Sequence, residues 1–191
     1  GQTIRFEDDL STGTLTTTGN GYNLELLGAN TSVTAATTFA NTGNLKLGND
    51  STDNLSFAGG LVVTEPSSIS LGGTVSTTNA AMTLGDNNTA LTLADHLTLN
   101  TAGGALNMNG AVDGTLANTQ SLTLNAGSAG VVSVTGAVGQ TTALHTLTLS
   151  HSHGATFSSP VTAVTAVVLS NTAVGQTIRF EDDLSTGTLT T

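Results

Sequence analysis

The chain has 191 residues, of which only 8% are charged and 3% aromatic, and its formal net charge is −10. With three basic residues and no cysteine, it lacks the cations that a phosphate backbone requires and the thiols of disulfides and cysteine-based zinc sites, so neither nucleic-acid binding nor those cross-links are predicted. It contains no apolar run of about 18 residues, so insertion into a membrane as a helix is not predicted either.

The sequence of residues 1–17, GQTIRFEDDLSTGTLTT, recurs unchanged as residues 175–191. The two copies are offset by 174 residues, because the first begins at Gly1 and the second at Gly175. Chance does not produce an identical match of this length in a chain this short. We therefore interpret residues 1–174 as one tandem repeat and residues 175–191 as the start of the next repeat of a longer array.

Pairs of apolar residues separated by one residue predict a short strand at regular intervals along the chain. In chain order they are Leu24/Leu26, Leu45/Leu47, Ile69/Leu71, Leu97/Leu99, Leu122/Leu124, Leu147/Leu149 and Val167/Leu169. Counting one such strand per unit predicts seven rungs in each 174-residue repeat, or about 25 residues per rung.

Two further strands follow within each rung. The second is predicted at Thr37/Phe39, Leu55/Phe57, Met82/Leu84, Leu106/Met108, Val132/Val134, Ala155/Phe157 and Ile178/Phe180. The third, shorter one is predicted at Leu61-Val62, Ala111-Val112, Ala137-Val138 and Val161. Three short strands per rung, joined by turns rich in Gly, Asn and Asp, are typical of a parallel β-helix.

Alternation along each strand predicts that one set of side chains fills the interior while the other faces water. Stacking of like positions predicts an interior column of Leu47, Leu71, Leu99, Leu124 and Leu149 and an exterior column of Thr98, Thr123 and Thr148. The phenylalanines predicted to point inward are Phe6, Phe57, Phe157 and Phe180. The register stays open between residues 72 and 95, where Met82/Leu84 and Leu91/Leu93 compete.

These patterns predict an all-β protein, a single parallel β-solenoid segment over residues 1–191. Disorder is the first alternative, because Thr, Ser, Gly and Asn are abundant, but strict alternation of apolar residues is not a disordered pattern. A β-sandwich is the second alternative, although it commonly uses large core aromatics and this chain has no Trp and one Tyr.

The run from Ser121 to Ala163, SLTLNAGSAGVVSVTGAVGQTTALHTLTLSHSHGATFSSPVTA, resembles the repeats of large bacterial exoproteins of the filamentous-haemagglutinin-like and autotransporter-adhesin kind. The resemblance implies a right-handed β-helical shaft that is secreted and held at the bacterial cell surface. The secretion domain of that family is not visible in this chain.

Oxygen-rich turns are the first candidate sites, because Ca²⁺ takes several carboxylate and carbonyl ligands. The candidate calcium ligands are Glu7, Asp8, Asp9, Asp50, Asp53, Glu181, Asp182 and Asp183. The competing interpretation is a solvated charged turn for residues 7–9 and 181–183, and ordinary Asx-turn chemistry for residues 49–54 and 86–88. That second interpretation is favoured, and calcium is the one cofactor considered.

Histidines are the second candidate, since His145, His151 and His153 are close in sequence and the last two would share a face of an extended strand. No cysteine or nearby acid offers a third ligand, so a surface turn is favoured over a transition-metal site. No nucleophile elbow, P-loop or paired-carboxylate motif occurs, so no catalytic residue is predicted and the chain is not expected to be an enzyme.

The predicted function is a structural repeat of a giant extracellular or cell-surface bacterial adhesin-like protein, acting as a rigid shaft. A self-assembling extracellular filament or sheath protein is the alternative. A polysaccharide-binding or polysaccharide-cleaving β-helix module is a further one, disfavoured because one repeat holds so few basic residues for a binding groove.

The predicted partners are further copies of the repeat, by end-to-end self-association or covalent continuation, together with cell-surface or polysaccharide contacts. The strand at Leu24 would start a rung, so Gly1 is predicted to enter the solenoid at the second strand of a rung. Continuation would then place Glu181–Asp183 on the same face as Glu7–Asp9.

Overall fold

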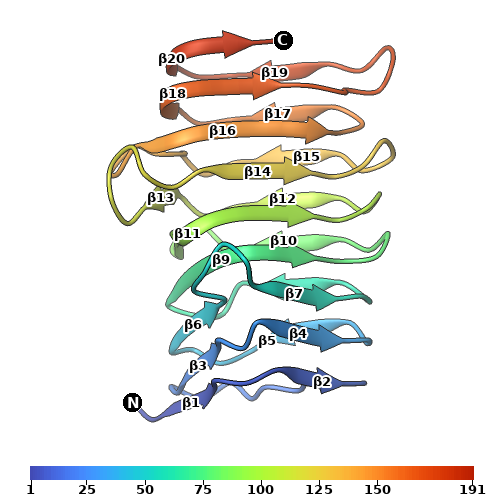
Figure 1. The fold of residues 1–191 in the computed structure, drawn as a ribbon, viewed down its shortest axis with the longest axis vertical. Coiled ribbons are helices and arrows are strands. Elements are labelled where there is room, and N and C mark those ends of the chain that lie inside the picture. The colour runs from blue at the N-terminus through green and yellow to red at the C-terminus, as the bar shows by residue number, and fades with distance from the viewer.

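The structure, a computed structural model, describes residues 1–191 and consists of twenty β-strands with no helix. The chain coils upward through about eight turns of about 23 residues, and neighbouring turns pair in parallel (Figure 1). In Figure 1 the front strands run from left to right and the back strands return as the chain climbs, so the coil is right-handed. The predicted β-solenoid is therefore confirmed.

Each turn contributes to three faces. The first face contains β1 (Thr3–Phe6), β3 (Asn23–Leu26), β6 (Asn44–Leu47), the start of β9 (Ser68–Ser76), the start of β11 (Ala90–Asn100), β13 (Val112–Gly114), the start of β18 (Val161–Leu169) and the start of β20 (Leu184–Thr190). An isolated parallel bridge through Val138 links Val112 to Val161 and completes this face.

The other two faces follow in the same turn. The second face contains β2 (Leu10–Thr12), β4 (Asn30–Val33), β7 (Asn54–Phe57), β14 (Leu122–Asn125), the later part of β16 (Leu144–His151) and the later parts of β9, β11, β18 and β20. The third face contains β5 (Thr37–Phe39), β8 (Leu61–Val63), β10 (Met82–Leu84), β12 (Leu106–Met108), β15 (Val132–Val134), β17 (Ala155–Phe157) and β19 (Ile178–Phe180).

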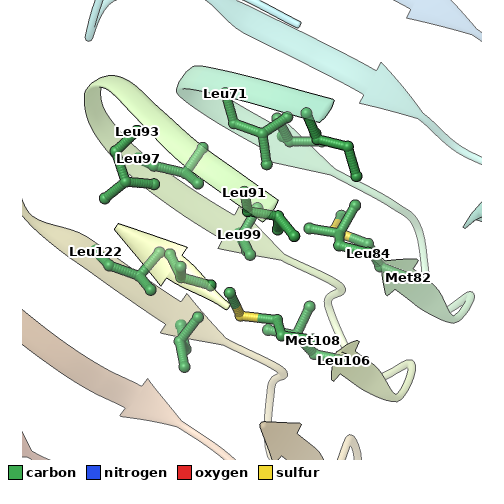
Figure 2. Packing of buried hydrophobic residues seen from close by; sticks show 14 of the residues in the cluster. Leu71, Met82, Leu84, Leu91, Leu93, Leu97, Leu99, Leu106, Met108 and Leu122 are labelled. Carbon is green, nitrogen blue, oxygen red and sulfur yellow. The ribbon is translucent and has the colours of Figure 1, made fainter. Parts of the chain in front are cut away.

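The interior is one cluster of 36 buried apolar side chains that runs along the axis. Figure 2 shows leucines and methionines of successive turns meeting in this interior, where Met82 is in register with Leu106 and Leu84 with Met108. Each fully buried side chain of this size contributes roughly 1.5–3 kcal/mol of transfer free energy. Because no single turn can bury its own apolar face, the turns depend on one another for stability.

The predicted exterior threonine column is confirmed, since Thr98 pairs with Thr123 and Thr123 with Thr148. The predicted leucine column is wrong at one step. Leu71 stacks on Leu93 in the first face, whereas Leu99 belongs to the second face and stacks on Val75. Both competing registers in residues 72–95 are used, because they occupy different faces.

That step explains the overestimated rung length. On the first face, seven successive pairings lead from Ile4 to Val161, so these two residues are seven full turns apart. From Val161 the chain crosses the second face and reaches Ile178 on the third, which adds two-thirds of a turn. The 174 residues between these isoleucines therefore cover seven and two-thirds turns, so a turn takes about 23 residues rather than 25. Dividing the 174 residues by seven whole rungs therefore overestimated the number of residues per turn.

Three of the four phenylalanines predicted to point inward contribute to the core. Phe57 and Phe157 are fully buried, and Phe180 packs partly buried against the cluster. Phe6 is the exception, with 36% of its surface exposed. Phe6 lies in register with buried Leu26, so it points toward the interior, but no turn lies beneath β1 to cover it.

The placement predicted for residues 1–17 is also wrong. β1 pairs with β3, so the chain enters on the first face, at the strand that starts a turn. The identical residues 178–180 form β19 on the third face, paired with β17. One sequence therefore occupies two different faces, because alternate apolar residues fit the interior of any face equally well.

Close backbone approach at the corners requires glycine. A Cβ atom built on Gly136 would overlap with the carbonyl oxygen of Gly110, one turn below, and one built on Gly110 would overlap with that of Thr89. The two glycines let the chain turn between the third and first faces without separating the turns.

No helix that could cross a membrane is present.

Candidate functional site

Apart from Glu25 in β3 and Asp113 in β13, the acidic side chains lie on two edges of the solenoid. The edge between the first and second faces carries Glu7, Asp8, Asp9, Asp50, Asp53 and Asp95. The edge between the third and first faces carries Glu65, Asp86, Glu181, Asp182 and Asp183. The two identical acidic triplets thus lie on different edges, and the prediction that they share a face is wrong.

The loop of residues 49–53 is organised by its own carboxylates. Asp53 is 5% exposed, and its Oδ2 accepts hydrogen bonds from the backbone N–H of Asn49 (2.8 Å) and Asp50 (3.1 Å). Asp50 Oδ1 accepts from the Thr52 backbone N–H (2.9 Å) and from Thr52 Oγ1 (2.8 Å). These bonds, the backbone one foremost, hold the pKa of Asp50 below its ordinary value.

A second loop supports the first. Asp95 Oδ2 accepts a hydrogen bond of 3.1 Å from the Ser51 backbone N–H, and its Oδ1 accepts one of 2.7 Å from the His96 N–H. His96 Nδ1 in turn accepts from the Ser121 N–H at 3.1 Å. The carboxylates of this region therefore act as acceptors for backbone amides, and the bond from the Thr52 N–H to Asp50 is the predicted Asx turn.

The first acidic triplet has partners in the turn above. Arg5 Nε donates to Glu25 Oε2 at 2.5 Å, and Arg5 Nη1 lies 3.6 Å from Glu7 Oε1. The pKa of Arg5 is raised by this pairing, with the hydrogen bond to Glu25 the largest cause. Asp9 accepts from the Asn30 backbone N–H (2.8 Å) and from Asn30 Nδ2 (3.1 Å).

The side chains of the second triplet have local partners alone. Glu181 Oε1 lies 3.5 Å from Arg179 Nη1, and Asp182 Oδ1 accepts from the Asp183 backbone N–H at 2.8 Å. The Asp183 carbonyl accepts from the Val161 N–H at 2.9 Å, which anchors the turn to the solenoid. Nothing in either triplet turns its carboxylates toward a common point.

No group of three or more His, Asp or Glu side chains converges anywhere in the structure in a way that could hold a metal ion. The candidate calcium ligands therefore lie in separate turns, and those with partners bind backbone amides, Asn30 or a nearby arginine. Asp86 follows the same pattern, since its Oδ1 accepts from the Asn88 N–H at 2.9 Å and this backbone bond is the leading cause of its lowered pKa.

The histidines are spread over several partners. His151 and His153 both face outward on either side of buried Ser152, as the alternation predicted. His151 Nε2 accepts from Asn171 Nδ2 (3.2 Å), whereas His153 Nδ1 lies 3.2 Å from the Ser128 carbonyl oxygen. The two imidazoles therefore bind different neighbours.

His145 lies in β16 and contacts neither of the other two. Its Nδ1 lies 3.0 Å from Asn118 Oδ1 and 3.0 Å from Thr165 Oγ1, which come from the turns on either side. This small polar network spans three turns. Neither this network nor the Ser51–Asp95 contact nor the Arg5–Glu25 pair was predicted from the sequence. The opposite charges of Arg5 and Glu25, about one turn apart in the sequence, are the one signal that could have indicated their pairing.

The hollows of the surface are at the two ends of the coil. One is lined by residues 5–9, and the other lies beside Leu169, Ile178 and Thr191. Comparisons of the chain with protein-family models, with curated proteins and with solved structures find no match.

Proposed function

We propose that the chain is a structural repeat of a large extracellular or cell-surface bacterial adhesin-like protein, in which it acts as a rigid shaft. The observation that carries the proposal is the single core of 36 side chains, which runs unbroken along the axis. Such a core gives length without a hinge, because each turn packs on the turns above and below it.

The backbone supports the same role. The chain makes 106 backbone hydrogen bonds, 60 of them within its strands. Every strand pairing is parallel between successive turns, so the bonds between strands run along the axis. Outward carboxylates bind the backbone, as in the Asp50 and Asp95 turns. In this proposal the chain is a spacer, performs no catalysis and needs no cofactor.

The proposal is tested by locating the protein on the cells that make it. Antibodies against the purified chain are expected to label intact cells, with gold particles standing off from the outer surface in electron micrographs. A cytoplasmic protein labelled on the same sections is the control. Labelling that requires permeabilised cells would overturn the extracellular assignment.

An extracellular filament is the second candidate, favoured by the two open ends. Ile4 is 46% exposed at one end and Leu189 is 50% exposed at the other, and both belong to strands with one paired neighbour. Open strands over an apolar interior invite further pairing. The shaft and the filament both require copies of the solenoid to stack, by covalent continuation or between separate chains.

A further inference from the structure

The duplicated segment is the one part of the chain that the structure shows in two environments. Residues 1–17 form the bottom of the solenoid, with β1 on the first face and β2 on the second (Figure 1). Residues 175–191 form the top, with β19 on the third face and β20 on the first and second. The two copies have the same sequence, but residues 1–17 are covered by the turn above and residues 175–191 by the turn below.

In the lower copy the upper side is covered. Ile4 stacks under Leu24 and Phe6 under Leu26 in a parallel ladder. The polar contacts that accompany this ladder are the 2.5 Å hydrogen bond between Arg5 and Glu25 and the two bonds from Asn30 to Asp9. The lower side of the same strand is bare, which leaves Ile4 and Phe6 exposed.

In the upper copy the lower side is covered. Ile178 stacks on Ala155 and Phe180 on Phe157, whose rings are parallel to within 7° at a centroid distance of 4.8 Å. The upper side is bare. Arg179 is 65% exposed and has Glu181 as its one ion-pair partner, and the hollow beside Ile178 and Thr191 opens here.

We infer that the upper end of the solenoid is a docking surface for a second copy of this chain, which lays its own β3 (Asn23–Leu26) on Ile178–Phe180. The second copy's Leu24 and Leu26 then cover Ile178 and Phe180, and its Glu25 binds Arg179. Its Asn30 binds Asp183. Every one of these contacts already exists within one chain, between residues 1–17 and residues 23–30.

Docking of this kind exchanges identical segments. Residues 175–191 of one copy take the place of residues 1–17 of the second copy. Because the two segments are identical, the second copy regains every contact that its own residues 1–17 had made, as in domain swapping. The copy's own residues 1–17 compete for the same position, and this competition limits assembly of the unaltered chain. The inference specifies the junction for the end-to-end stacking proposed above.

The junction also fixes the relative rotation of the copies. The shared segment lies on the third face of the lower copy and on the first face of the upper copy. Successive copies are therefore rotated by one face about the axis, and the acidic triplet moves to the next edge at each junction. A row of triplets along one edge, as the sequence had suggested, does not form.

The duplication supplies its own matched variants for the test. Phe6→Asp releases the competing lower segment and uncovers β3, while the docking segment at the top is unchanged. Phe180→Asp makes the same substitution in the same sequence but damages the docking strand. The double variant Phe6→Asp/Phe180→Asp has an uncovered β3 and no strand to bind it.

Sedimentation velocity over a concentration series measures the outcome, and circular dichroism confirms that each variant retains its β-structure. The Phe6→Asp chain is expected to assemble into multiples of the chain mass as the concentration rises, while the Phe180→Asp and double variants stay at one chain mass. Assembly of the double variant to the same extent, or a Phe6→Asp chain that stays at one chain mass throughout, would overturn the inference.

The register is tested separately by cross-linking, since the chain has no cysteine of its own. In the Phe6→Asp background, a chain with Arg179→Cys is mixed with one carrying Glu25→Cys. Adjacent strands about 4.8 Å apart bring the two Cα atoms within disulfide range, so an intermolecular disulfide between these positions is expected on oxidation.

The control partner for the cross-link carries Lys46→Cys, one turn farther along the same face, and is expected to remain unlinked. Linking through residue 46 in preference to residue 25 would contradict the register. Failure of both junction experiments would leave the surface-labelling result untouched, and failure of the labelling would leave the junction standing.

Discussion

The direction in which a side chain leaves its strand decides its role in this protein. Leu124 stacks between Leu99 and Leu149 and is fully buried, whereas neighbouring Thr123 lies in an exterior column. Alternation in the sequence was sufficient to predict this difference. It could not predict the exposure of Phe6, because exposure depends on whether a turn lies beneath the strand, and no local pattern records that.

Removing one leucine from the core tests the cost of an interior gap. Leu124→Ala is expected to lower the free energy of unfolding by about 2–5 kcal/mol, because the turns above and below cannot both collapse into the cavity. Thr123→Ser, one residue away on the outer side, is expected to cost less than about 1 kcal/mol. Urea unfolding followed by circular dichroism measures both, and equal losses would contradict the assigned direction.

The carboxylates in the turns make the folding stability depend on pH. The pKa of Asp50 is lowered in the folded chain, so its contribution is present above the unfolded value and is lost as the pH falls through the lower folded value. The pH range in which Asp50 loses its contribution to stability therefore lies below about pH 4. NMR titration of the carboxyl carbons is expected to place Asp50 below ordinary aspartates, and Thr52→Val should raise its pKa by removing one donor. A midpoint unchanged by that substitution would contradict the hydroxyl's contribution.

At the scale of the strand, the sequence predicted most elements, though not β4 (Asn30–Val33), and assigned some to the wrong face. The strand at Leu97/Leu99 was treated as equivalent to the one at Ile69/Leu71, although the first belongs to the second face and the other to the first face. Strands of every face show the same alternation, so the pattern cannot distinguish them. The candidate calcium turns were predicted as loops, but their contacts with the next turn, such as Ser51 with Asp95, depend on a register that the pattern did not supply.

The corners between strands are tested by adding one methyl group. Gly136→Ala is expected to cost about 1–3 kcal/mol, because the new Cβ overlaps with the Gly110 carbonyl and the turns must move apart. The matched control is Gly72→Ala, whose Cβ would meet its nearest neighbour, the Asn49 backbone, at 3.4 Å, an ordinary contact distance. Thermal unfolding compares the two, and an equal loss of stability in both would contradict a special role for the corner at Gly136.

At the scale of the whole molecule, the stack of turns should be most stable in its middle. β14 pairs with a strand on each side, whereas β1 and β20 each have one paired neighbour. Protection of backbone amides against hydrogen exchange is therefore expected to be highest in β12 to β15 and to decline toward both ends. Mass spectrometry of peptides measures this gradient. Uniform protection along the chain would mean that the turns unfold as one unit.

The separation of the acidic turns gives a second test of the whole molecule. With no group of carboxylates converging on a point, EDTA is expected to leave the melting temperature unmoved. A calcium ion held at a hundredfold its Kd would instead stabilise the fold by about 2.7 kcal/mol, and chelation would then lower the melting temperature by roughly 5–10 °C. Differential scanning calorimetry with and without added calcium separates the two results.

The alignment of the backbone hydrogen bonds with the axis has a mechanical consequence. A load applied along the coil acts directly on the bonds between neighbouring turns, and an end turn, bonded on one side, has the fewest to break. Each turn that peels off releases about 23 residues, which extend to roughly 75 Å while the coil shortens by about 4.8 Å. The coil is therefore expected to unfold one turn at a time under tension. In a single-molecule pulling experiment we expect a series of equal steps in extension near this length. A single jump of the whole chain would show that the turns do not unfold one by one.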